Sequence, residues 1–292
     1  MKRGYADTPE GQIHYYMDGE GEPLLLLHQT GSSRQYWKLM PLLSKAYKVF
    51  ALDTLGSGNS DPLPPKVEMH DLAQSAVHFM DALGIEKAHV FGFHTGNKIA
   101  TEMAASWPSR IDGLILGGHT HSIFPDPKEL LAVMGPMVFP RLQEYDPSPD
   151  GSHLLKQWAA DFSRLAATWW DTSTFSKEKL TPELFQRRKE RIIDSLQARG
   201  EAEKYRAIFA MDLGVRMRHI QAKTLVIEIR VPAEAHLSPQ GAKLTKLIPN
   251  SRLATVENPA GGLAVEAKAE ELAELILDFL RSVRQSKSAA RA

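Results

Sequence analysis

The chain has 292 residues, of which 43% are hydrophobic, and it is therefore long enough to bury a large core as one domain with an inserted segment. Lysine plus arginine and aspartate plus glutamate both total 35, so the formal charge of zero gives no electrostatic reason to expect nucleic acid or an anionic membrane as a partner. The absence of cysteine excludes disulfides, thiolate metal sites and a cysteine nucleophile.

The first 118 residues alternate strands with helices. A strand is predicted near 13–17, and a buried apolar strand ends at His28 after a glycine-rich turn. The helices that follow are predicted over 32–46, 70–83 and 96–106, and the strands over 48–53, 87–94 and 113–118. Such alternation is typical of a parallel sheet with right-handed crossover connections.

The alternation stops in residues 122–218, which contain no convincing strand but several helical stretches, including 153–167 and 182–197. It resumes with a strand over 225–229, a helix over 239–247 and a strand over 252–256. The final helix has one apolar face, which should lie against the sheet; that face comprises Leu272, Leu275, Ile276, Phe279 and Leu280. We therefore predict a core formed by residues 1–121 and 219–292, interrupted by a helical segment over 122–218.

Residues 92–96 read Gly-Phe-His-Thr-Gly, which has the form of a nucleophile elbow with histidine in place of the attacking serine. In the G-x-S-x-G elbow a strand turns into a helix so tightly that the central residue is strained and projects above the sheet. Gly92 and Gly96 lack a Cβ, so the first allows a sharp reversal and the second allows the helix to pack close to the strand. Because a G-x-x-x-G pattern alone is weak, it needs support from other segments.

Three other segments give that support, and with the elbow they resemble the α/β-hydrolase fold superfamily. Residues 23–31 resemble its strand and H-G-x-G loop, residues 51–61 its D-x-x-G-x-G-x-S-D signature, and residues 224–227 with 248–253 its last two strands. The resemblance runs from about residue 11 to residue 282. It implies an α/β-hydrolase fold, with a mostly parallel eight-stranded sheet flanked by helices and a helical cap inserted after the sixth strand.

The same resemblance implies that all three members of the catalytic triad are changed. An active hydrolase of this fold has a nucleophile, an acid and a histidine in that chain order. Here His94 takes the nucleophile position, Pro232 takes the acid position with Glu234 two residues beyond, and the stretch 257–262 ends in glycine where the histidine is expected. The ordinary serine mechanism is therefore predicted not to operate.

His94 can act in two ways. Imidazole has an ordinary pKa of about 6.5, so it moves protons well at neutral pH, and general acid/base work is the first possibility. The second is direct attack on an activated ester through an acyl-imidazole. Both are helped by a carboxylate on one ring nitrogen, for which Glu234 is the first candidate and Glu257 the second.

The resemblance also implies an oxyanion site beside His94. Backbone N–H groups of Thr95 and of the Gln29-Thr30 turn can converge on a developing negative charge. Gln29 replaces the usual glycine, so either its amide enters the pocket as a donor or its altered backbone spoils the site. Asp53 follows the next strand, and in this superfamily that position generally braces the neighbouring loops.

Four more histidines follow strand ends, where ligands of α/β sheets bind, and are expected near the pocket: His28, His119, His121 and His236. His28 has a structural alternative, because a histidine in that loop is ordinary in the superfamily. The histidine spacing matches no standard zinc signature, so we predict no metal and no cofactor. Aromatic residues of the predicted cap, including Trp169 and Trp170, are expected to line an apolar pocket.

Two functions follow from this pattern. The favoured one is an atypical enzyme, a hydrolase or lyase that uses His94 on a small, largely apolar carbonyl compound such as an ester, lactone or β-keto compound. The alternative is a ligand-binding protein that has kept the pocket and lost catalysis. The predicted partner is thus a small molecule, and neither nucleic acid nor a membrane is expected as a partner. The protein is predicted to be cytoplasmic. The sequence leaves the oligomeric state open.

Overall fold

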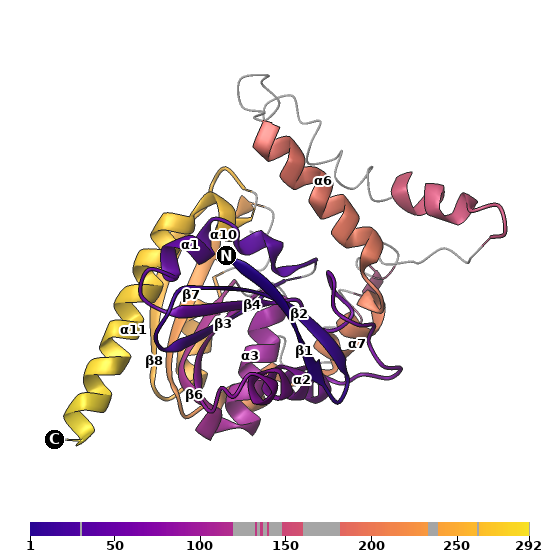
Figure 1. Cartoon of the computed structure of the whole chain (residues 1–292). Helices are drawn as coiled ribbons and strands as arrows, with labels where there is room; N and C mark the ends of the chain where they lie inside the picture. Colours follow the sequence, from indigo (N-terminus) through magenta and orange to yellow (C-terminus); the bar gives the residue numbers. More distant parts are fainter. Residues whose placement is uncertain are drawn as a thin grey trace.

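The computed structural model describes residues 1–29, 31–118, 132, 135–136, 139, 148–159, 182–232, 239–261 and 263–291. At its centre lies an eight-stranded sheet in the order β1-β2-β4-β3-β5-β6-β7-β8 (Figure 1). The strands are β1 (Lys2–Thr8), β2 (Gly11–Asp18), β3 (Pro23–Leu27), β4 (Lys48–Leu52), β5 (Ala88–Phe93), β6 (Ile111–Gly117), β7 (Lys223–Arg230) and β8 (Ser251–Glu257). β1 and β2 run antiparallel and the other six strands run parallel, so the predicted fold class is confirmed.

The pattern of residues does not predict β1, and the reason is its position at the edge of the sheet. Ala6 is buried there, whereas the other side chains of the strand are exposed or half-buried. β1 is held by antiparallel pairing with β2 along its whole length, from Lys2 opposite Met17 to Thr8 opposite Gly11. Pairing with β2 therefore forms a strand that no run of apolar residues predicts.

The described helices include η1 (Ser33–Tyr36), α1 (Leu39–Leu43), α2 (Met69–Ala82), α3 (Thr95–Ser106), η2 (Pro108–Arg110), α6 (Pro182–Gln197), α7 (Glu201–Ala210), α8 (Leu213–Met217), α9 (Gly241–Leu247), α10 (Ala264–Ala267) and α11 (Ala269–Arg291). The single helix predicted over 32–46 is wrong, because η1 and α1 are separate. Pro41 lacks the N–H that a continuous helix would bond to the carbonyl of Trp37, so the chain forms a 3-10 turn first.

The hydrophobic core has two layers, one on each face of the sheet. Leu25 and Leu27 of β3 pack toward the layer that includes α2 and α3. Leu24 and Leu26 point to the opposite face, toward α1 and α11. This follows from the alternation of side chains along a strand, and both layers are apolar because a parallel sheet is covered on both faces.

The described part of residues 122–218 is mostly helical. Residues 152–159 are in helix, and α6 has the bounds that the sequence predicts. In Figure 1, α6 extends away from the sheet, and the shorter α7 connects it to the core. Phe209 of α7 and Met217 of α8 are fully buried in the main core, so this end of the segment is continuous with it. A separate cap over 122–218 stays a prediction.

Candidate active site

His94 lies at the turn between β5 and α3, at the carboxyl end of the central strands. Its backbone has φ 51° and ψ −107°, a combination that non-glycine residues rarely adopt. Among the described residues, only Lys66 is another non-glycine residue with positive φ. A conformation of this kind costs about 1–3 kcal/mol and persists only where the surroundings enforce it. The strained elbow predicted from residues 92–96 is therefore present.

The two glycines of the elbow are required by close backbone contacts. A Cβ on Gly92 would lie 2.4 Å from the carbonyl oxygen of Gly96, and a Cβ on Gly96 would lie 1.9 Å from that of Leu27. No side chain fits at either distance. The first glycine allows the turn and the second allows α3 to approach β3, which are the roles inferred from the sequence.

The imidazole of His94 lies over the end of β6. A Cβ added to Gly118 would come within 2.8 Å of His94 Nε2, and Gly118 has a positive φ of 61°. The ring also meets Phe93 edge-on, with centroids 4.4 Å apart. The backbone N–H of His94 donates to the Gly117 carbonyl at 3.0 Å, and Asn97 Nδ2 donates to the Gly118 carbonyl at 2.8 Å. The half-buried imidazole thus lies against the Phe93 ring and close to Gly118, at the carboxyl ends of β5 and β6.

His28 occupies the neighbouring strand end, and its environment differs. It is 1% exposed, and its Nε2 accepts the Thr54 N–H at 3.0 Å. Because Nε2 accepts, the proton belongs on Nδ1, which donates to the Gln29 carbonyl. Burial, helped by the positive charge of Lys204, lowers the pKa of His28 to about 4. His28 is therefore neutral at physiological pH and binds the loop after β3, which matches its structural alternative.

Asp53 braces the loops, as predicted. Its Oδ1 accepts from the N–H and hydroxyl of Ser33 at 2.7 and 2.6 Å, and its Oδ2 contacts His14 Nδ1 at 2.9 Å. Oδ2 also accepts the Asn59 N–H at 3.0 Å. Burial favours the neutral carboxyl, yet these hydrogen bonds, led by the one from His14, hold the pKa of Asp53 at about 2.

Sequence reasoning missed two buried ionisable residues that reach this end of the sheet from α6 and α7. Lys204 is 3% exposed and donates to the Ser57 hydroxyl at 2.6 Å and to the Thr54 hydroxyl at 3.3 Å. Asp194 is 3% exposed and accepts from the Ser32 hydroxyl. Burial lowers the pKa of Lys204 to about 8 and raises that of Asp194. These two residues are distinguished only by their burial, which the spacing of apolar residues along the helices does not predict.

The structure places only some of the predicted site residues. Thr95 begins α3 directly after His94 and is 8% exposed, and Gln29 is half-buried beside His28. Seven others lie outside the described residues: Thr30, His119, His121, Trp169, Trp170, Glu234 and His236. Three of the four histidines that were expected near His94 are among these seven residues. The predicted cluster of histidines and the predicted absence of a metal therefore stay predictions.

Two carboxylates lie at or near the carboxyl ends of the last two strands, β7 and β8. Glu257 has a side chain that is 63% exposed and pairs with Arg230 at 2.9 Å. Glu228, which the sequence analysis did not consider, is buried, accepts the Gly241 N–H at 2.6 Å and pairs with Arg230 at 2.8 Å. Both carboxylates are therefore engaged at the β7–β8 edge.

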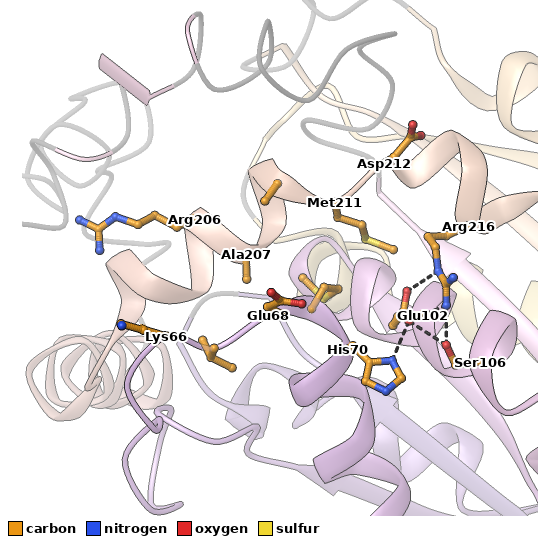
Figure 2. A pocket seen from close by; sticks show the side chains of 13 residues that line it. Lys66, Glu68, His70, Glu102, Ser106, Arg206, Ala207, Met211, Asp212 and Arg216 are labelled. Carbon is orange, nitrogen blue, oxygen red and sulfur yellow. Dashed lines mark hydrogen bonds and ion pairs between the residues drawn. The ribbon is translucent and has the colours of Figure 1, made fainter.

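A pocket of about 730 Å³ lies on the flank of the core, and His94 is not among its lining residues (Figure 2). It is bordered by residues of α2, α3, α7 and α8. The buried carboxylate of Glu102 organises one end, because Arg216 grips it with two hydrogen bonds of 2.6 Å and His70 approaches it at 3.1 Å. Figure 2 shows this network together with Ser106. It is a satisfied structural cluster that joins α3 to α8.

The comparisons with known proteins agree with this geometry. A family model described as alpha/beta hydrolase fold matches residues 22–212. The chain belongs to the α/β-hydrolase fold family. It is 31% identical to a 2-hydroxy-6-oxononadienedioate/2-hydroxy-6-oxononatrienedioate hydrolase of Pseudomonas putida, with 92% of each chain covered. It is 30% identical to the 2-hydroxy-6-oxo-6-phenylhexa-2,4-dienoate hydrolase of Comamonas testosteroni, over 94% of this chain and 93% of that one.

Solved structures share the fold of this α/β-hydrolase family member. An enol-lactonase from Burkholderia xenovorans superposes with a TM-score of 0.72 at 22% identity, over 95% of this chain and all 100% of that one. A meta-cleavage product hydrolase from Pseudomonas fluorescens gives a TM-score of 0.65 at 22% identity, over 96% and 97%. In the described part of the chain, no helix is both long and apolar enough for a transmembrane segment.

Proposed function

We propose that this protein is a hydrolase of small, largely apolar carbonyl compounds, with His94 as the reacting side chain. The strained backbone of His94 at the elbow carries the proposal. An unfavourable conformation of about 1–3 kcal/mol, at the position from which this fold presents its nucleophile, is typical of a functional residue. The curated relatives are hydrolases of 2-hydroxy-6-oxo-dienoates, so such dienoates are the first carbonyl compounds to test.

In the proposed reaction His94 is a general base and then a general acid. Its imidazole takes a proton from a water molecule, and the hydroxide formed attacks the substrate carbonyl. The tetrahedral intermediate collapses, the bond to the leaving group breaks, and the imidazolium returns the proton to that group. We further propose that the backbone N–H of Thr95, which begins α3 directly after His94, stabilises the negative charge on the carbonyl oxygen.

The proposed mechanism works without the triad of the family. The positions that resemble the acid and histidine sites hold Pro232 and glycine, neither of which can titrate. Glu257 is engaged with Arg230, so Glu234 is the proposed carboxylate for orienting the His94 ring. Direct attack by His94, through an acyl-imidazole that water then hydrolyses, is the variant of this mechanism for substrates with good leaving groups.

The test is turnover by the purified protein of a 2-hydroxy-6-oxo-dienoate, short aryl esters and a lactone. His94→Ala and the exposed His219→Ala are assayed in parallel, the second as a matched histidine control. Activity that disappears in His94→Ala and survives in His219→Ala supports the proposal. Equal activity in His94→Ala and the parent protein would refute it, because the reaction would then not use His94.

A second function, ligand binding without turnover, is favoured by the loss of titratable groups at two triad positions. The same panel of compounds separates the two functions. A compound that raises the melting temperature and is recovered unchanged after long incubation indicates a binding protein. Turnover of that compound indicates an enzyme.

A further inference from the structure

Lys204 carries a positive charge into the interior of the protein. It projects from α7, is 3% exposed, and its described hydrogen-bond partners are the hydroxyls of Ser57 and Thr54 at 2.6 and 3.3 Å. The carboxylates of Asp53 and Glu201 act on it through space, but burial outweighs them and its pKa falls to about 8. A buried ammonium group is expensive to retain, so its position calls for an explanation other than packing.

A chain of hydrogen bonds connects Lys204 to the loop after β3, and each group in the chain donates to the next one. An ammonium group only donates, so Thr54 Oγ1 accepts from Lys204 and keeps its own proton for His28 Nε2, 3.3 Å away. The Thr54 N–H donates to the same nitrogen at 3.0 Å. With two donors on Nε2, the proton of His28 must lie on Nδ1, where it is donated to the Gln29 carbonyl.

The charge acts in the same direction as the hydrogen bonds. Burial is the largest cause of the low His28 pKa, and the Asp53 carboxylate acts against it; the positive charge of Lys204 disfavours a second proton on the ring and so helps to keep the pKa low. An imidazolium could not accept from Thr54, and the arrangement would break. Lys204 thus favours both the neutral form and one tautomer of His28.

We propose that Lys204 is a positioning residue, which acts through Thr54 and His28 to hold the Gln29 carbonyl beside His28. A carbonyl oxygen released from His28 could turn toward the elbow at His94, where it would repel the negative charge that develops on the substrate oxygen in the proposed reaction. The link also makes α7 a support of this loop. The proposed effect of Lys204 on catalysis rests on the proposed function. The proposed effect of Lys204 on the protonation of His28 is independent of it.

The first test reads the His28 ring directly. Long-range ¹H–¹⁵N spectra of the protein, with His28 identified among the 11 histidines by its loss in His28→Gln, report the tautomer and the titration of the ring. In Lys204→Met the His28 midpoint should move upward from about 4. The exposed Lys243→Met on α9 is the matched control and should leave it in place. An unchanged midpoint and tautomer in folded Lys204→Met would overturn the proposal.

The second test uses activity, if the proposed hydrolase reaction is observed. Lys204→Met should lower kcat by about tenfold with a KM change of less than about twofold, because it disturbs a carbonyl near the oxyanion and not the substrate pocket. Lys204→Gln retains an amide donor and should recover part of kcat. An effect on KM alone, or an equal loss in Lys243→Met, would contradict a positioning role.

The two tests fail in different ways. A protein without turnover removes the second test and the proposed function, yet the spectra still decide the role of Lys204. If Lys204→Met does not fold, Lys204→Gln, which keeps a polar head group, takes its place in the spectra and is expected to shift the His28 midpoint in the same direction. A folded Lys204→Gln with the parent midpoint would then overturn the proposal.

Discussion

His94 and His28 stand at the same edge of the sheet, on the parallel neighbours β5 and β3, yet their surroundings make them different residues. Leu27 pairs with Gly92, so each strand ends beside the other. His28 is fully buried, with one ring nitrogen on Thr54 and the other on Gln29. His94 is half-buried on a strained backbone, with its ring over a glycine. Two histidines at neighbouring strand ends therefore differ in burial and in backbone conformation, although they share a place in the fold.

The largest expected effect is a loss of activity that added imidazole reverses at His94 but not at His28. His94→Gly should lower kcat/KM by about 10²–10⁴-fold, the usual contribution of a general acid/base, and added imidazole should restore part of the rate. His28→Gly should also lose activity, through its loop, but imidazole should restore none of it. The measurement is the initial rate with and without imidazole in both variants. Rescue of both, or of neither, would remove the distinction between the two histidines.

The next effect concerns stability at acid pH. The pKa of His28 is about 4 when folded and 6.5 when unfolded, so between these values the unfolded chain binds more protons. Stability should therefore fall as the pH falls from about 6.5 to about 4, by on the order of 3 kcal/mol, and His28→Gln should flatten this slope. Urea unfolding at several pH values measures it. An equal slope in His28→Gln would show that His28 is not the titrating group.

Asp53 should extend the loss of stability to lower pH. Its pKa is about 2 when folded and 3.8 when unfolded, so its contribution is complete above about 4 and is lost as the pH falls toward about 2. Asp53→Asn should reduce the pH dependence in this lower window. A change confined to the window between about 4 and 6.5 would contradict this assignment.

Gly118 gives a smaller effect that tests the position of the His94 ring. Gly118→Ala combines a positive φ with a Cβ 2.8 Å from His94 Nε2, whereas Gly84 has φ 66° and open space around a Cβ. Both alanine variants should lose about 1 kcal/mol of stability through the backbone. Only Gly118→Ala should also lower kcat/KM, because it displaces the imidazole. Equal kinetics in the two variants would place the reacting atoms away from Gly118.

The smallest expected effect is a gain in stability when His94 is replaced by glycine. Glycine accepts φ 51° without strain, and after the entropy of the unfolded glycine is subtracted the variant should gain about 1 kcal/mol. Lys66→Gly, at φ 58°, is the matched variant and should leave kcat/KM unchanged. A destabilised His94→Gly would mean that the imidazole contributes packing that exceeds the strain.

The sequence allowed good prediction where structure depends on neighbouring residues. The elbow is such a case, because two glycines four residues apart and the flanking strand and helix patterns already require a tight turn at His94. The structural role of Asp53 was predictable from its motif. The edge strand β1 and the break between η1 and α1 were missed, the first because pairing creates it and the second because the apolar pattern continues across the break.

By itself, then, the sequence determined the fold family, the strand-turn-helix at the elbow and the presence of an imidazole there, since each follows from local pattern and spacing. Only the tertiary structure decided which distant polar groups meet. Lys204 is 150 residues from Thr54, and Asp194 is 162 residues from Ser32, yet each pair is in contact. The physical reason is that a buried charge is tolerated only where the completed fold supplies its partners, and no local pattern records where those partners lie.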